Sequence, residues 1–285
     1  MTEPSMKMTH GDGIALGVAV WEGKGKELLC IHGLSANGRC WDIIASSLVT
    51  DLRVIAVDLR GRGRSDKPAA GYSIDVHVRD LCALINDMKL SKPIVMGHSL
   101  GAYIALVLAA RHPDLVDSII LVDGGGMLNQ MQTEQFQNAI KPALDRLTQV
   151  FPSFEDYIAP IKMAPFFQPW TQTLENYFRN DVKEVAGGIA SLVAAETIIE
   201  EALNLQQTDF HEFYPLVKCD TLILRATNGI LGPADLLLPD YSVEEMLRSL
   251  SSVRCIDIPG ANHYSIVFQP NEYRDRVIRE FLDGR

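Results

Sequence analysis

The sequence predicts an α/β protein whose mostly parallel β-sheet is covered by helices on both faces. Six short apolar runs are each followed by a turn or a loop, and they alternate with stretches that have helical periodicity. Short runs that are apolar throughout are typical of strands buried on both faces of a parallel sheet. The repeated alternation of strand and helix indicates the layered α/β class. The apolar runs are residues 28–33, 53–58, 93–98, 118–123, 221–226 and 253–258.

The elements around these runs follow from local signals. Residues 5–21 are expected to form a hairpin, because Gly11-Asp12-Gly13 supplies a turn between two strand-like runs. Pro113 ends the second of four helical segments, because proline cannot continue a helix. The helical segments are residues 75–89, 100–111, 243–250 and 271–282.

Residues 127–215 interrupt the alternation and are expected to form a helical insertion. This stretch contains few strand-like runs and holds 12 of the chain's 21 aromatic side chains. Its clearest helical segments cover residues 133–151 and 184–205. We therefore predict one core domain, formed by residues 1–126 and 216–285, and an insertion that lies over it as a lid.

Composition and charge exclude several classes of partner. The chain has 285 residues and a formal net charge of −10, which argues against nucleic acid and anionic membranes. Residues 1–13 lack the apolar segment of a signal peptide, and the longest apolar stretch, near residues 103–110, is too short to span a bilayer. The five cysteines are odd in number and lack CxxC spacing, so we expect neither a disulfide framework nor a zinc site. These features predict a cytoplasmic protein.

The segment Gly97-His98-Ser99-Leu100-Gly101 predicts a nucleophilic serine. It lies between an apolar run and a helical segment, where a sharp strand-to-helix turn lifts the serine Oγ out of the sheet. The two glycines are expected because side chains there would collide with neighbouring elements. The start of the following helix also offers backbone N–H groups beside Ser99. His98 is expected to be packed or hydrogen-bonded rather than to act as the base.

Together with the order of strands and helices, four motifs resemble the α/β-hydrolase superfamily from about residue 28 to the end of the chain. The resemblance implies that residues 127–215 are the cap of that family. It also implies that Leu34 and Leu100 donate backbone N–H groups to an oxyanion hole, and that His32 supports the first of these loops. The motifs are His32-Gly33, "DLRGRGRSD" at 58–66, "GHSLG" at 97–101 and "GANH" at 260–263.

His263 is the predicted general base. It follows the last apolar run, on a loop that can reach the carboxyl edge of the sheet, where open α/β sheets place their sites. In this role it takes the proton of Ser99 during attack and returns it to the leaving group.

The position of the triad acid stays open between two aspartates. Most superfamily members carry the acid after the strand at residues 221–226, but the matching residue here is Gly229. Asp235 lies further along the same loop, and Asp123 ends the fourth apolar run. The haloalkane-dehalogenase branch, which resembles this chain at residues 227–235, uses the second position, and this favours Asp123. A site without a functional acid is the third alternative.

These residues predict a serine hydrolase that cleaves a carboxylic ester or a lactone and requires no metal or organic cofactor. Serine favours acyl chemistry over the alkyl-enzyme chemistry of a carboxylate nucleophile. The aromatic residues of the insertion, with "PFFQPW" at 165–170, favour an apolar or aromatic small-molecule substrate, unless they form the insertion's own core. Hydrolysis of a carbon–carbon bond in a ring-cleavage diketone, or acyl transfer, would use the same residues. A ligand-binding receptor or pseudoenzyme is the non-enzymatic alternative. We expect a monomer or a homodimer.

Overall fold

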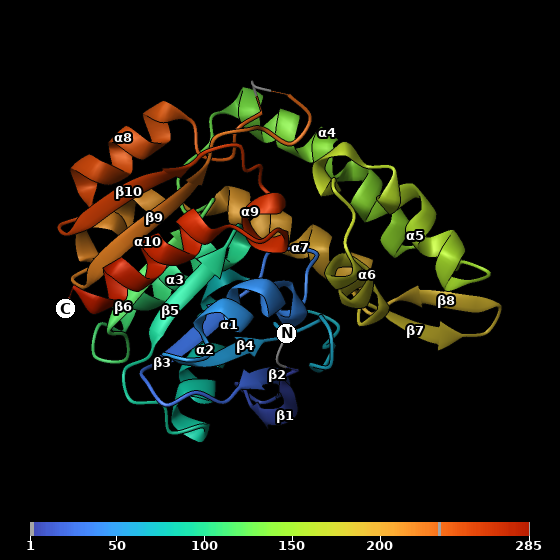
Figure 1. Ribbon diagram of the computed structural model, residues 1–285, viewed down its shortest axis with the longest axis horizontal. Helices are drawn as coiled ribbons and strands as arrows, with labels where there is room; N and C mark the ends of the chain where they lie inside the picture. Colours follow the sequence, from blue (N-terminus) through green and yellow to red (C-terminus); the bar gives the residue numbers. More distant parts are fainter. Residues whose placement is uncertain (1–2, 233–234, 285) are drawn as a thin grey trace.

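The computed structural model describes residues 3–232 and 235–284, and its centre is an eight-stranded β-sheet (Figure 1). The strand order is β1-β2-β4-β3-β5-β6-β9-β10. The pairs β1–β2 and β2–β4 are antiparallel, and the remaining pairs are parallel, which confirms the predicted sheet. The strands are β1 Ser5–His10, β2 Ala15–Trp21, β3 Glu27–Ile31, β4 Arg53–Val57, β5 Ile94–His98, β6 Ser118–Val122, β9 Asp220–Ala226 and β10 Val253–Ile258.

Helices cover both faces of the sheet because successive residues of each central strand point to opposite sides. In β3, Leu29 and Ile31 pack into one apolar core with helices α2, α3 and α8, whereas Leu28 and Cys30 pack into a second core with α1 and α10. The helices are α1 Asp42–Leu48, α2 Ile74–Asp87, α3 Leu100–Arg111, α8 Asp240–Ser249, α9 Ser265–Phe268 and α10 Glu272–Asp283. The structure thus confirms the four predicted helices, with ends shifted by a few residues.

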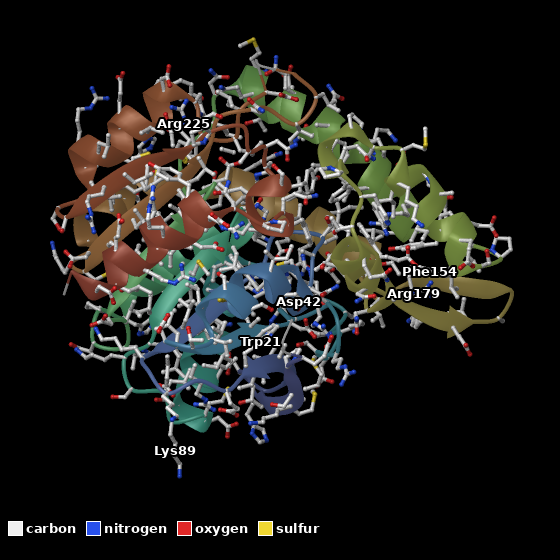
Figure 2. All side chains as sticks on the ribbon, viewed as in Figure 1. Trp21, Asp42, Lys89, Phe154, Arg179 and Arg225 are labelled. Carbon is white, nitrogen blue, oxygen red and sulfur yellow. The ribbon has the colours of Figure 1, made fainter. Side chains whose placement is uncertain are left out.

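Residues 127–215 connect β6 to β9, and their first part, from α4 to the hairpin β7–β8, lies to one side of the sheet (Figure 1). Aromatic and cationic side chains hold this segment together: the Arg179 guanidinium lies 4.0 Å from the centroid of the Phe154 ring (Figure 2). Its elements are α4 Gln130–Leu147, α5 Phe154–Lys162, α6 Gln172–Arg179, β7 Val182–Val185, β8 Gly188–Ser191 and α7 Ala195–Gln207.

Among the described residues of the whole chain, single-turn 3₁₀ helices occur at Gly38–Trp41, Pro165–Phe167, Phe210–Glu212 and Tyr214–Leu216.

The prediction of one helix over residues 184–205 was wrong at its start. The structure forms the antiparallel hairpin β7–β8 there, and α7 begins only at Ala195. Gly187 and Gly188 adopt φ angles of +91° and +142°, which are unfavourable for L side chains and incompatible with a right-handed helix. A Cβ atom on Gly188 would lie 1.9 Å from the Phe151 carbonyl oxygen, so this close approach requires glycine.

Candidate active site

Ser99 lies on a tight turn between β5 and α3, at the carboxyl end of the central strands. Its φ and ψ angles are 54° and −119°, a strained conformation of the kind found at functional sites. The turn closes only because its neighbours lack side chains. A Cβ atom on Gly97 would lie 2.0 Å from the Gly101 carbonyl oxygen, and one on Gly101 would lie 2.1 Å from the Ile31 carbonyl oxygen. The glycines expected from the sequence are therefore sterically required.

The structure brings Asp123 and His263 into direct contact. Asp123 follows β6, is 1% exposed, and places Oδ2 2.7 Å from His263 Nδ1. Its other oxygen, Oδ1, accepts a hydrogen bond of 3.1 Å from the Ala226 N–H at the end of β9. The imidazole of His263 and the side chain of Ser99 line one cavity. Ser99, His263 and Asp123 thus lie near one another at the carboxyl ends of the central strands, with the carboxylate hydrogen-bonded to the imidazole.

Asp235, the alternative acid, directs its carboxylate into its own loop. Oδ2 accepts a hydrogen bond of 2.7 Å from the Leu231 N–H, and Oδ1 accepts one of 3.1 Å from the Gly232 N–H. A Cβ atom on Gly229, where most of the superfamily carries the acid, would lie 1.9 Å from the Gly232 carbonyl oxygen of the backbone. The loop therefore has no room for a side chain at that position.

His98 fixes the backbone of the residue that carries the imidazole. Burial lowers the pKa of His98 well below its ordinary value, so the ring is neutral at neutral pH. Its Nε2 donates a hydrogen bond of 2.8 Å to the His263 carbonyl oxygen, and the two ring centroids lie 4.5 Å apart. Sequence reasoning placed His98 in a packed or hydrogen-bonded position but did not identify its partner.

The two residues expected to supply backbone N–H groups lie on either side of Ser99 in the fold: Leu100 follows it in the chain, and Leu34 lies on the loop after β3. Leu100 is the first residue of α3, where backbone N–H groups have no acceptor within the helix. Leu34 follows β3 and lines the cavity. His32 fixes the loop that follows β3. Its Nδ1 donates to the Gly33 carbonyl oxygen at 2.7 Å, and its Nε2 accepts from the Leu59 N–H at 3.0 Å. Burial lowers the pKa of His32 to about 3, so this neutral tautomer persists.

Arg62 also holds this loop, and sequence analysis did not single it out. Its side chain is fully buried, and Nε and Nη2 donate hydrogen bonds of 3.0 Å and 2.8 Å to the Leu34 carbonyl oxygen. The only signal in the sequence is that arginine occupies the middle of "GRGRSD", between two glycines. A guanidinium with glycine on both sides can approach backbone carbonyls closely, but the sequence does not indicate which carbonyl.

A cavity of about 440 Å³ lies above Ser99. It is lined by residues of the sheet region and by residues of the segment 127–215. Much of its wall is aromatic, including Phe166 and Phe167 from the "PFFQPW" segment. Trp170 of the same segment instead stacks on Phe178, with ring centroids 5.8 Å apart, and therefore belongs to the packing of the insertion. Phe166 and Phe167 thus lie at the cavity wall, whereas Trp170 packs within the insertion.

Arg146 brings a positive charge to this cavity. It comes from α4, and its side chain is 11% exposed. Its Nη1 contacts the Tyr157 hydroxyl and lies 3.6 Å from Asp181 Oδ2. Burial raises the pKa of Asp181 to about 6, and the charge of Arg146 opposes this rise.

Residues 3–232 and 235–284 contain neither a grouped set of metal ligands nor a membrane-spanning helix. No group of three or more His, Cys, Asp or Glu side chains in these ranges is placed to hold a metal ion. Within the same ranges, no helix has both the length and the apolar character needed to cross a bilayer.

Fold and site together define the class of the protein. Residues 27–155 match the family model of the α/β hydrolase fold, and the chain belongs to the α/β-hydrolase superfamily. It is 27% identical over 266 residues to the 2-(acetamidomethylene)succinate hydrolase of Mesorhizobium japonicum, covering 92% of this chain and 90% of the relative.

Two further comparisons agree with this class. The crystal structure of E-2-(acetamidomethylene)succinate hydrolase superposes with a TM-score of 0.87 at 25% identity, covering 98% of this chain and 99% of that chain. The 3-hydroxybutyrate-oligomer hydrolase of Cupriavidus necator is 27% identical over 272 residues, which cover 90% of this chain and 88% of the relative. The protein is therefore an α/β hydrolase.

Proposed function

We propose that this protein is a serine hydrolase that cleaves a carboxylic ester or a lactone through an acyl-enzyme. The observation that carries the proposal is the 2.7 Å contact between Asp123 Oδ2 and His263 Nδ1 beside a cavity that Ser99 also lines. A carboxylate at this distance keeps the proton on Nδ1, so Nε2 remains available as the base. The acid thus comes from the end of β6, the position used by the haloalkane-dehalogenase branch.

The reaction divides into two halves that use the same groups. Ser99 Oγ attacks the carbonyl carbon while His263 Nε2 takes its proton, and the negative charge on the substrate oxygen is stabilised by the N–H groups of Leu34 and Leu100. His263 then protonates the leaving alcohol, and Ser99 remains acylated. Water activated by His263 attacks the acyl carbonyl, and the acid product leaves with Ser99 restored.

The lining of the cavity supports an apolar acyl or alcohol group that also carries a carboxylate. Phe166, Phe167 and Phe178 form apolar walls, and Arg146 adds a guanidinium, which binds carboxylates in two-pronged geometry. Two relatives support the same class, since one acts on a succinate derivative and the other on 3-hydroxybutyrate oligomers. Arg146 is partly compensated by Asp181, whose Oδ2 lies 3.6 Å from Nη1, so a bound carboxylate would share the guanidinium with Asp181.

Hydrolysis of an amide is the second candidate, because one relative, matched over 92% of this chain, is a 2-(acetamidomethylene)succinate hydrolase. The amide and ester reactions differ at one step, in which His263 protonates an amine instead of an alkoxide. Carbon–carbon bond hydrolysis and acyl transfer would use the same serine and histidine but need a different leaving group or acceptor.

The experiment is a substrate panel with Ser99→Ala as the control. Matched p-nitrophenyl esters and p-nitroanilides compare ester with amide hydrolysis, and addition of an alcohol acceptor tests acyl transfer. Labelling of Ser99 by a fluorophosphonate should depend on His263, whereas a receptor or pseudoenzyme would label poorly. Ester turnover that survives Ser99→Ala would overturn the proposal.

The proposal includes the setting of the reaction. Residues 127–215 act as a cap over a core of residues 1–126 and 216–285, which is supported by a cavity lined from both parts. The protein acts as a monomer or homodimer in the cytoplasm, on a small molecule rather than on nucleic acid or membranes. Sedimentation of the purified chain and fractionation of cells test these two statements.

A further inference from the structure

A buried ionic cluster joins helix α7 of the insertion to the sheet region. Glu201, on α7, is 1% exposed, and its two carboxylate oxygens accept hydrogen bonds from Arg62 Nη2 and from His77 Nε2. Arg62 and His77 have no exposed surface. Three titratable side chains thus meet in the interior, outside the Ser99, His263 and Asp123 group.

The charges in this cluster balance only when α7 is in place. Burial lowers the pKa of Arg62 to about 9, which leaves it charged at neutral pH. Burial also holds the pKa of His77 well below its ordinary value, so His77 is neutral and donates from Nε2. Arg60, two residues away, is already paired with Asp80 at 2.6 Å. Glu201 is therefore the anion that compensates Arg62, and an unpaired charge at this depth would be strongly unfavourable.

The Arg62 guanidinium also contacts the loop after β3 that contains Leu34, called the oxyanion loop below. The Leu34 N–H belongs to the Gly33–Leu34 peptide, whose carbonyl oxygen is fixed by His32 at 2.7 Å. The next peptide is fixed by Arg62, which donates to the Leu34 carbonyl oxygen at 3.0 Å and 2.8 Å. With both flanking carbonyls held, the direction of the Leu34 N–H is set. A small displacement of such a donor weakens its contact with an oxyanion.

We infer that Glu201 and Arg62 are positioning residues. They couple the packing of helix α7 against the sheet region to the geometry of the oxyanion hole. The inference rests on the proposed function, because it assigns Leu34 as a donor to the developing oxyanion. When α7 lies in place, Glu201 orients the guanidinium and the guanidinium orients Leu34. When α7 moves away, Arg62 loses its counter-ion and the loop loses its support.

Helix α7 contains a matched control for this inference. Glu200, the preceding residue, also joins α7 to the sheet region, because its Oε1 accepts hydrogen bonds of 3.0 Å from the Gly71 and Tyr72 N–H groups. Glu200→Gln removes a charge from the same helix and disturbs a contact of the same kind, made through the N–H groups of Gly71 and Tyr72 rather than through Arg62 or Leu34. The ring of Tyr72 lies 5.9 Å from the Arg62 guanidinium, but Glu200 holds the backbone of Tyr72 and not its ring. Comparison of the two sites separates a general effect of docking α7 from an effect on the oxyanion loop.

The test uses the double variant Arg62→Met/Glu201→Gln in the full chain, so that neither member of the ion pair remains buried and charged. Removal of an oxyanion donor costs about 10²–10³-fold in rate, and displacement of a donor that remains present should cost about 10–100-fold. We expect kcat for a p-nitrophenyl ester to fall by that factor while KM changes little. Inhibition by a phenylalkyl trifluoromethyl ketone, whose adduct with Ser99 carries an oxyanion, should weaken by the same factor. Glu200→Gln should retain the wild-type kcat.

Three results would overturn the inference. A folded double variant with wild-type kcat would show that Leu34 needs no support from Arg62. A rise in KM with unchanged kcat would assign the cluster to substrate binding. An equal loss of kcat in Glu200→Gln would show that docking of α7 matters in general. If the double variant does not fold, Arg62→Lys replaces it, because lysine keeps the charge opposite Glu201 but cannot form the paired guanidinium hydrogen bonds to the Leu34 carbonyl oxygen. Wild-type kcat in that variant would overturn the inference too. Loss of activity in Ser99→Ala, measured alongside, keeps the test of the proposed function separate.

Discussion

Replacement of Asp123 by asparagine probes the contact on which the proposed triad depends. In the wild-type protein, Oδ1 accepts from the Ala226 N–H at 3.1 Å and Oδ2 lies 2.7 Å from His263 Nδ1. The backbone donor is fixed, so the asparagine oxygen should stay on Ala226 and the amide N–H₂ should face Nδ1. This favours the tautomer with the proton on Nε2, which cannot accept the proton of Ser99. In a well-studied serine protease the same change costs about 10⁴-fold, which corresponds to about 5 kcal/mol of transition-state stabilisation.

The assay for this variant is kcat/KM with a p-nitrophenyl ester, together with thermal melting. Asparagine has the shape of aspartate, so the melting temperature should stay within roughly 5 °C of the wild type. Asp235→Asn is the control, because Asp235 contacts the N–H groups of its own loop. Its kcat/KM should stay within about twofold of the wild type. Nearly full activity in Asp123→Asn, or a large loss in Asp235→Asn, would return the acid to the loop after β9.

Three further predictions address specificity, stability and pH. Arg146→Gln should lower kcat/KM for esters that carry a carboxylate by about 10–100-fold relative to matched neutral esters, and equal losses for both would contradict carboxylate binding. Gly101→Ala should lower the free energy of unfolding by about 3 kcal/mol or more, measured by urea denaturation, because its Cβ would lie 2.1 Å from the Ile31 carbonyl oxygen. Asp181 has a pKa of about 6 in the folded protein and an ordinary value of 3.8, so its contribution to stability is present below pH 3.8 and is lost as the pH rises through 6. Asp181→Asn should therefore gain about 3 kcal/mol relative to the wild type between pH 4 and pH 7, and the opposite trend would mean that pairing with Arg146 outweighs burial.

Much of the fold was predictable because its signals are local. Continuous apolar runs indicate strands buried on both faces, and the structure places all six in the central sheet. The serine turn was predictable for the same reason, since a Gly-x-Ser-x-Gly segment between strand and helix has a steric requirement that can be read directly. The hairpin at residues 182–191 was not recognised, because its apolar and small residues also fit a helical pattern. Only the Gly187-Gly188 pair pointed to a turn.

The rest of the site depends on contacts between distant residues. The sequence left Asp123 and Asp235 as alternatives, because both follow sheet strands within reach of a histidine on a later loop. Their hydrogen-bond partners distinguish them, and these partners exist only after the strands are ordered in the sheet. Arg62 and Glu201 are 139 residues apart in the chain, and no periodicity or motif joins them. Interactions of this kind follow from tertiary packing and have no local signature.

The backbone of the site is a continuation of the sheet's hydrogen-bond ladder. The Ser99 N–H donates to the Val122 carbonyl oxygen at 3.1 Å, the Asp123 N–H donates to the Leu224 carbonyl oxygen at 2.8 Å, and the Ala226 N–H donates to the Asp123 carboxylate. Opening either of the first two bonds requires the ends of central strands to separate, whereas the third can also open by rotation of the Asp123 side chain. The amides of Ser99 and Asp123 should therefore exchange with solvent deuterium as slowly as the core, at the rate of global unfolding. On heating, Ser99 and Asp123 should keep their geometry until the whole sheet melts, so that loss of the proposed activity and unfolding coincide.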